Sequence, residues 1–159
     1  MRTARLVAPL LAALLLVVVA CDDDEADPNQ PQEQRVLDVD TTSGEPVCMQ
    51  VDEDFPAEVD KLPVIGCDVA HTHEIYATIV YDEKSVFPGV EELGTFAEVK
   101  CLEAFEPFVG TSAFDSSLSY TWLVPTLAGW NDEDDREVLC VASSRDGSPL
   151  VGSVRSTGV

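Results

Sequence analysis

The chain has two histidines, His71 and His73, separated by a single threonine. On an extended strand this spacing puts both imidazole rings on one face, where they could share a metal ion. A catalytic zinc usually has at least three protein ligands, and Glu74 would point to the opposite face once the strand has begun. We therefore expect no metal and no cofactor, and expect His71 to hydrogen-bond a turn beside Cys67. A metal-dependent hydrolase that uses His71 and His73 is the alternative.

Nucleophilic catalysis has weaker support. A serine or cysteine nucleophile needs a histidine beside it to act as the base, and we expect the four cysteines beyond the N-terminal region to be oxidised. The G-x-S-x-G motif of serine hydrolases is absent from the sequence. We therefore predict that the protein is not an enzyme.

Four consecutive acidic residues, Asp132 to Asp135, could bind calcium through their carboxylate oxygens. The run lacks the alternating ligand spacing and the central glycine of an EF-hand loop. A solvated acidic loop in which Arg136 pairs with one carboxylate fits the pattern better. A cation-sensing domain is a second alternative.

Trp122 and Trp130 are the two tryptophans of the chain. Core packing is the better interpretation of Trp122. Trp130 stands before the acidic loop and is either a core residue or an exposed aromatic that contacts a sugar or a protein. Trp130 and His71 are our candidate residues for contact with a partner.

The first 20 residues have the organisation of a signal peptide: Arg2 and Arg5, then an apolar run over 6–20. That run is shorter than the about 20 residues that a membrane-spanning helix needs. Residues 18–21 (V-V-A-C) resemble the lipobox of bacterial lipoproteins, whose cysteine receives a diacylglyceryl group after cleavage. We therefore expect Cys21 to anchor the protein by lipid to the outer face of the cell membrane. Secretion with an unmodified Cys21 is the alternative.

The other four cysteines are even in number, in a domain that is expected to reach an oxidising compartment. They are Cys48, Cys67, Cys101 and Cys140. We predict two disulfides, for which three connectivities exist. Cys101 lies on the apolar face of a predicted helix, so a bond to Cys140 would tie that helix to a late strand. We favour the connectivity Cys101–Cys140 with Cys48–Cys67, and the other two connectivities stay open.

The protein is strongly acidic, with 30 Asp and Glu against 9 Lys and Arg and a net charge of −21. Nucleic-acid binding requires clustered basic residues, and none follow the signal peptide. The same charge is repelled by anionic lipid headgroups, so attachment to a membrane must come from the lipid. We exclude nucleic acid as a partner.

The patterning of the rest predicts one domain. Residues 21–44 are acidic and poor in apolar residues, which predicts a flexible tether, although 36–39 could dock as an edge strand. Strands are predicted over 47–51, 75–81, 119–125, 137–142 and 150–154, with 75–81 covered on both faces. A proline-containing loop is expected between the first two strands. Apolar residues at spacings of three and four predict one amphipathic helix between about 90 and 108.

These elements predict an α+β fold, with an antiparallel sheet of about five strands and the long helix packed on one face. The expected organisation is a signal peptide at 1–20, the tether at 21–44 and a globular domain at 45–159.

Several motifs, in a fixed order, resemble the septum formation family of actinobacterial cell-envelope proteins. They are the C-D-V-A-H-T-H-E-I segment at 67–75, the turn at 87–89, Cys101 on a helix, Trp130, Asp135-Arg136 and Cys140. The resemblance spans roughly residues 47 to 154. Ala70 stands where a proline is expected, and Asp134 where a glycine is expected.

The resemblance implies an extracytoplasmic, membrane-tethered domain with a link to cell division, and it implies no catalytic residue. We therefore expect a non-catalytic interaction module of the cell envelope, which contacts an envelope protein or a wall polymer.

Overall fold

The computed structural model describes residues 27–35, 39, 43, 45–51, 61–82 and 85–159. The predicted signal peptide, Cys21 and the first part of the predicted tether lie outside these ranges. Within them, no helix combines the length and the apolar character that crossing a membrane requires.

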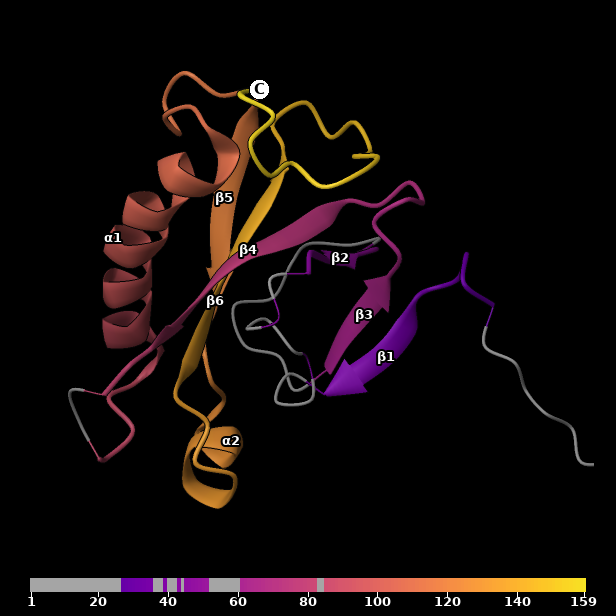
Figure 1. The fold of residues 1–159 in the computed structure, drawn as a ribbon. Coiled ribbons are helices and arrows are strands. Elements are labelled where there is room, and N and C mark those ends of the chain that lie inside the picture. The colour runs from indigo at the N-terminus through magenta and orange to yellow at the C-terminus, as the bar shows by residue number, and fades with distance from the viewer. Residues whose placement is uncertain (1–26, 36–38, 40–42, 44, 52–60, 83–84) are drawn as a thin grey trace, which may run out of the picture.

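Six strands form one antiparallel sheet in the order β1-β3-β2-β4-β6-β5 (Figure 1). They are β1 (Gln32–Arg35), β2 (Val47–Met49), β3 (Lys61–Ile65), β4 (His73–Val80), β5 (Leu118–Leu123) and β6 (Glu137–Ser144). The two eight-residue strands, β4 and β6, lie side by side, with His73 opposite Ser143 and Val80 opposite Glu137. The prediction of a central strand over 75–81 is confirmed.

Helix α1 (Val90–Val109) lies across β4, β5 and β6 on one face of the sheet (Figure 1). Its buried residues recur every fourth position and form one apolar row toward the sheet: Leu93, Ala97, Cys101, Phe105 and Val109. The helix ends at Gly110, whose φ of 95° is accessible to glycine without steric cost and whose N–H donates to the Glu106 carbonyl.

The outward face of α1 is acidic. Glu91, Glu98, Glu103 and Glu106 are exposed on it. The single lysine of the helix, Lys100, lies 2.8 Å from Glu103.

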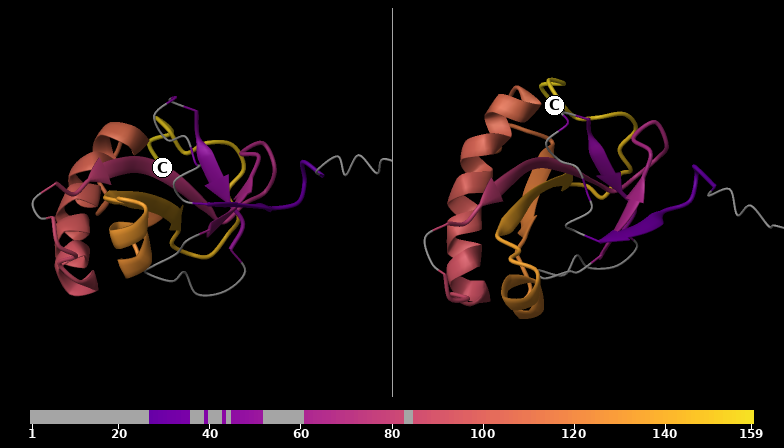
Figure 2. Two further views of the ribbon diagram at one scale, coloured as in Figure 1. Left: turned by 90° about the horizontal axis from the view of Figure 1, so that it is seen from below. Right: turned by 60° about the horizontal axis from the view of Figure 1, so that its bottom comes forward.

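Both faces of the sheet are buried at β6, where Val138, Cys140 and Ala142 belong to the core cluster beneath α1. Leu139 and Val141 belong to a second cluster. Because successive side chains of a strand point to opposite faces, the two clusters lie on opposite sides of the sheet. Figure 2 shows α1 on one of these sides and β1 and β3 toward the other.

The predicted α+β class, antiparallel sheet, single long helix and two disulfides are confirmed, but the sheet has six strands rather than about five. One missed strand, β1, lies inside the predicted tether. Gln32 to Arg35 pair with β3, and the side chains described from Asp27 to Gln34 are exposed. This strand is held by main-chain hydrogen bonds and not by burial of apolar side chains. Its apolar content is therefore low, and the hydropathy pattern did not indicate a strand.

The second missed strand, β3, lies in the predicted proline-containing loop. Pro63 has no N–H to give to a ladder, but its carbonyl accepts a hydrogen bond from the Gln50 N–H at 3.1 Å. Proline is therefore tolerated at this position, and the loop interpretation was wrong there.

The strand predicted over 150–154 is absent from this fully described segment. Only Leu150 forms a bridge, with His71, and Gly152 leaves the extended conformation at φ 80°. A short helix that was not predicted, α2 (Leu127–Asp132), begins at Thr126, whose hydroxyl accepts from the Gly129 N–H at 2.9 Å.

The favoured disulfide pairing is present in the structure. Cys48 of β2 is bonded to Cys67, with Cα atoms 5.2 Å apart. Cys101 of α1 is bonded to Cys140 of β6, with Cα atoms 5.3 Å apart. The second bond joins the helix layer to the sheet.

Both bonds are expected to stabilise the fold by restricting the unfolded chain. Sequence separations of 39 and 19 residues correspond to about 4 and 3 kcal/mol in the chain-entropy model. The double variant Cys101→Ala/Cys140→Ala should therefore lose more free energy of unfolding than Cys48→Ala/Cys67→Ala. Denaturant unfolding without reductant measures both, and a reversed order would contradict the expectation.

Candidate functional site

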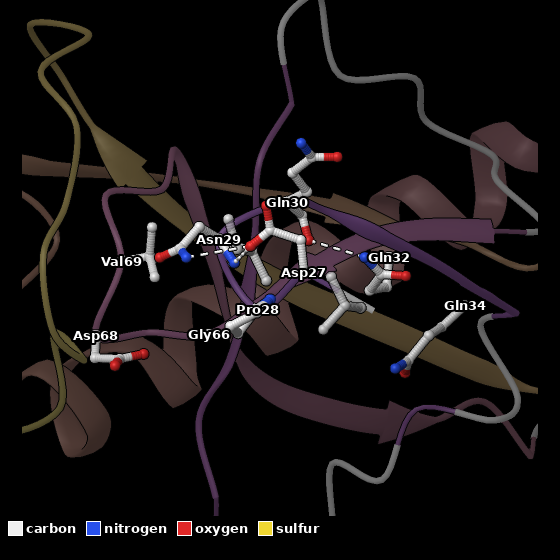
Figure 3. A pocket seen from close by; sticks show the side chains of 11 residues that line it. Asp27, Pro28, Asn29, Gln30, Gln32, Gln34, Gly66, Asp68 and Val69 are labelled. Carbon is white, nitrogen blue, oxygen red and sulfur yellow. Dashed lines mark hydrogen bonds between the residues drawn. The ribbon is translucent and has the colours of Figure 1, made fainter. Parts of the chain in front are cut away.

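A pocket with a volume of about 410 Å³ lies at the β1 edge of the sheet (Figure 3). More of its lining surface is apolar than polar, but we call it the polar pocket after the polar side chains around it. Its polar lining consists of two carboxylates and four amides: Asp27, Asp68, Asn29, Gln30, Gln32 and Gln34. Val64, Ile65 and Val69 supply apolar surface. In Figure 3, Asp68 and Val69 lie on one side of the pocket and Gln32 and Gln34 on the other.

This lining can both donate and accept hydrogen bonds. Each amide offers two N–H donors and a carbonyl acceptor, whereas an ionised carboxylate only accepts. Asn29 donates to Asp27 at 3.2 Å, and Gln32 donates to the Gln30 carbonyl at 3.2 Å. Among the described residues that line the pocket there is no lysine or arginine, so the pocket favours a hydroxyl-rich ligand over an anionic one.

One wall of the pocket is the turn Gly66–Val69, which closes with a hydrogen bond from the Val69 N–H to the Gly66 carbonyl at 3.1 Å. The turn is held from inside the protein. Cys67 is bonded to Cys48 of β2, and its carbonyl accepts from the Gly152 N–H at 2.7 Å. Buried contacts therefore fix the wall that presents Asp68 and Val69.

His71 is the third contact behind this wall. It is 0% exposed, and its Nδ1 lies 2.8 Å from the Val69 carbonyl oxygen. This geometry confirms the predicted hydrogen bond to a turn beside Cys67. Because a carbonyl only accepts, Nδ1 carries a proton, and in the neutral ring Nε2 then has a lone pair. Within the described part of the chain, Nε2 is the one buried side-chain nitrogen or oxygen without a hydrogen-bond partner.

His71 lies close to Glu74 rather than to a surface. Metal-ligand-type atoms of Cys48, His71 and Glu74, all buried, lie within 4.8 Å of one another. We expected Glu74 to point away from His71, and this was wrong. The regular strand begins only at His73, and a bend at Thr72 interrupts the alternation of faces before it.

Glu74 fastens the C-terminal segment to the sheet. It is 0% exposed. One of its oxygens accepts from the Ser153 hydroxyl at 2.5 Å, and the other accepts from the Val154 N–H at 2.7 Å. These bonds hold the segment that was predicted to be a strand.

His73 does not belong to the cluster of Cys48, His71 and Glu74 in the described chain. The imidazole is partly buried, and its Nδ1 lies 2.8 Å from the Thr72 hydroxyl. Burial, followed by the proximity of His71, lowers the pKa of His73 below its usual 6.5. The structure therefore does not bring the two histidines together with an acid in the way the hydrolase alternative needs.

Trp130 is 1% exposed, so its interpretation as a surface contact was wrong. The Arg136 guanidinium covers its ring at 3.8 Å from the centroid. The indole N–H donates to the Ser85 carbonyl at 3.2 Å, and the rings of Tyr81 and Phe87 pack against it. Like His71, this residue supports the fold from inside and does not meet a partner at the surface.

The acidic run does not converge on one point. Asp135 is 6% exposed, and its carboxylate accepts from the Glu137 N–H at 2.9 Å. Asp134 is exposed and lies 2.9 Å from Arg136, which confirms the predicted pairing. These four described acids are not among the groups that could hold a metal ion.

The sequence interpretation missed the polar pocket because its amides lie in the predicted tether. A signal was available in the spacing of Gln30, Gln32 and Gln34. Side chains two positions apart share one face of a strand, so this spacing places Gln32 and Gln34 on one face of β1, and Gln30 lies in the bend that precedes the strand.

Comparison with known proteins adds no relative: no protein-family model, no curated protein and no solved structure matches this chain. The resemblance to the septum formation family therefore rests on the quoted motifs alone.

A pH test follows from Glu137 beside Asp135. Burial, followed by the negative Asp135, raises the pKa of Glu137 above 4.5. A raised pKa means that the folded state binds the proton more tightly, so stability is lost as pH rises through the folded pKa. The variant Glu137→Gln should therefore melt about 1 to 3 °C higher at pH 7, and this gain should vanish below pH 4.5.

Melting curves of wild type and variant across pH 3.5 to 7.5 provide the measurement. Glu106→Gln is the control, because it removes the same charge from a side chain that is exposed on α1 and is not buried beside Asp135. An equal gain from Glu106→Gln at pH 7 would show that loss of net charge, and not burial beside Asp135, is the cause.

Proposed function

We propose that this protein is a lipid-anchored, extracytoplasmic interaction module of the cell envelope, and that its polar pocket binds a hydroxyl-rich wall polymer. The observation that carries this proposal is the lining of the pocket by four amides and two carboxylates. An alternative partner is another envelope protein that covers the same edge of the sheet.

The chemistry of the lining supports a glycan ligand. A sugar hydroxyl is both a donor and an acceptor, so it is matched by amides that do both and by carboxylates that accept. Asp68 and the glutamines of β1 lie on opposite sides of the pocket (Figure 3). A ligand between them would be held from two directions, on a wall that the Cys48–Cys67 bond fixes.

The position of the pocket along the chain supports a membrane-proximal ligand. Asp27 follows Cys21 by six positions, and a fully extended chain of that length spans at most about 20 Å. If Cys21 carries lipid, the pocket lies within roughly that distance of the outer face of the membrane. Polymer next to the membrane is then the accessible ligand.

Two further observations support an exported, non-catalytic role. Two disulfides are typical of oxidising compartments, which agrees with the signal-peptide pattern. In the described chain all four cysteines are oxidised and His71 is buried, which removes the groups that a cysteine–histidine mechanism would use. A role in cell division is proposed from the family resemblance alone.

The binding proposal predicts weaker retention on purified wall glycan when the pocket lining is altered. Each lost hydrogen bond is worth about 0.5 to 1.5 kcal/mol. Gln32→Ala and Asp68→Asn should therefore each weaken binding by roughly threefold to tenfold in a co-sedimentation assay. Glu103→Gln removes an exposed charge on α1 and should leave binding unchanged. Equal binding by all four proteins would remove the pocket from the proposal.

The anchor proposal predicts a change of fraction in cells. Cys21→Ser removes the thiol that would receive the diacylglyceryl group, so the variant should move from the membrane fraction to the soluble fraction. Intact-mass measurement of wild type should show a chain that begins at residue 21 and carries lipid. A variant that remains with the membranes would contradict lipid attachment at this residue.

A further inference from the structure

Three side chains with metal-binding atoms meet behind the pocket wall, and a fourth, Cys67, is joined to one of them by a disulfide. Cys48, His71 and Glu74 present ligand atoms within 4.8 Å of one another, and the Cys67 sulfur is bonded to that of Cys48. We infer that the disulfide closes a latent zinc site. When a dithiol reductant opens Cys48–Cys67, the two thiolates bind one Zn²⁺ together with His71 and Glu74.

His71 is arranged as metal-bound histidines usually are. Such a histidine donates its other ring N–H to a carbonyl or carboxylate, which fixes the tautomer and the direction of the ring. Here Nδ1 donates to the Val69 carbonyl at 2.8 Å. Nε2 is left as a buried lone pair with no hydrogen-bond partner, and an unsatisfied buried nitrogen is costly unless something binds it.

Glu74 is also held in place by outer contacts. The Ser153 hydroxyl and the Val154 N–H each donate to one of its oxygens. A carboxylate oxygen has two lone pairs, so each oxygen still has one for a metal after accepting these bonds. The same two contacts fix the direction of the carboxyl group, as second-shell donors do in metal sites.

The ligand set suits zinc, which binds thiolate sulfur, imidazole nitrogen and carboxylate oxygen in tetrahedral sites. Bonds of about 2.0 to 2.3 Å bring tetrahedral ligands to within roughly 3.3 to 3.8 Å of one another. Cys48, His71 and Glu74 would have to draw together from their present spacing of up to 4.8 Å, and the two sulfurs, now bonded to each other, would have to move apart. The two cysteines already have Cα atoms only 5.2 Å apart.

The reaction balances in two steps. The reductant gives two electrons and two protons to Cys48–Cys67, whose S–S bond breaks to give two thiols, and the reductant's own two sulfurs join in a new disulfide. Zinc then replaces both thiol protons, which pass to solvent. Four protein ligands complete the tetrahedron, so the site is structural and not catalytic.

Burial determines how the ion would enter. Cys48, His71 and Glu74 are each 0% exposed, and the C-terminal segment lies over them. Leu150 and His71 exchange two main-chain hydrogen bonds, at 2.8 and 3.0 Å. Loading therefore requires this segment to open locally. The zinc chemistry does not depend on what the pocket binds. Opening Cys48–Cys67 does remove the bond that fixes the pocket wall, so glycan binding is measured on the oxidised chain and zinc binding on the reduced one.

The test uses the mature chain, in oxidised form and after reduction with a water-soluble phosphine in place of the dithiol, because a phosphine does not bind zinc tightly. The phosphine takes an oxygen atom from water to become the phosphine oxide, and the two protons of that water go to the two thiols. A chromophoric chelator in competition measures bound metal. We expect one zinc per reduced chain and no stoichiometric zinc on the oxidised chain. Co²⁺ in place of Zn²⁺ should show thiolate charge-transfer bands and the intense visible bands of a tetrahedral site.

Variants of the two histidines provide a matched pair. His71→Asn removes a ligand and should cost more than the roughly 10- to 100-fold typical of outer-shell changes. His73→Asn alters the neighbouring histidine outside the cluster and should bind as wild type does. If His71→Asn fails to fold, alkylation of the reduced wild type with and without zinc decides: added zinc should slow the modification of Cys48 and Cys67, and should not change the rates at Cys101 and Cys140, which are buried in the core in either case.

Three results would overturn the inference. They are equal zinc binding by oxidised and reduced chains, alkylation rates of Cys48 and Cys67 that zinc does not change, and no metal on a reduced chain that is still folded by circular dichroism.

Discussion

The bond between Cys48 and Cys67 is the constraint on which the rest of this structure depends. It joins β2, inside the sheet, to a turn that would otherwise be an exposed connection. His71 and Gly152 hold the same turn through its carbonyl groups. Since buried polar groups need partners, these contacts leave the turn little freedom. The wall of the pocket is therefore determined by residues that no ligand in the pocket would touch.

The second constraint is the burial of β6 on both faces. One face of this strand packs against α1, and the other packs against the cluster of Met49, Leu62 and Ile75. The protein has a net charge of −21, and repulsion among its acidic side chains destabilises the compact state. The apolar contacts of β6 oppose this repulsion. The bond from Cys101 to Cys140 crosses this layer and limits how far helix and sheet can separate.

The sequence predicted most accurately the elements that have apolar periodicity. Helix α1, strands β4 and β6 and the two disulfides follow from spacings that burial imposes. β1 and β3 were missed because one is ordered by main-chain pairing with exposed side chains and the other contains Pro63. Trp130 and His71 were recognised as unusual, but their burial depends on Arg136, Val69 and Leu150, contacts that only the folded chain defines. The pocket depends on β1, so it could not be predicted without that strand.

The acidic outer face of α1 has a consequence for how the domain would rest at a bilayer. The helix and β1 lie toward opposite sides of the sheet, and four exposed glutamates on the helix have one lysine among them. An anionic lipid surface repels such a face over about 8 Å at physiological salt. If Cys21 carries lipid, as proposed, this repulsion would turn the helix away from the membrane and the β1 edge toward it. Charge and anchor together would then give a small, singly attached domain a preferred orientation.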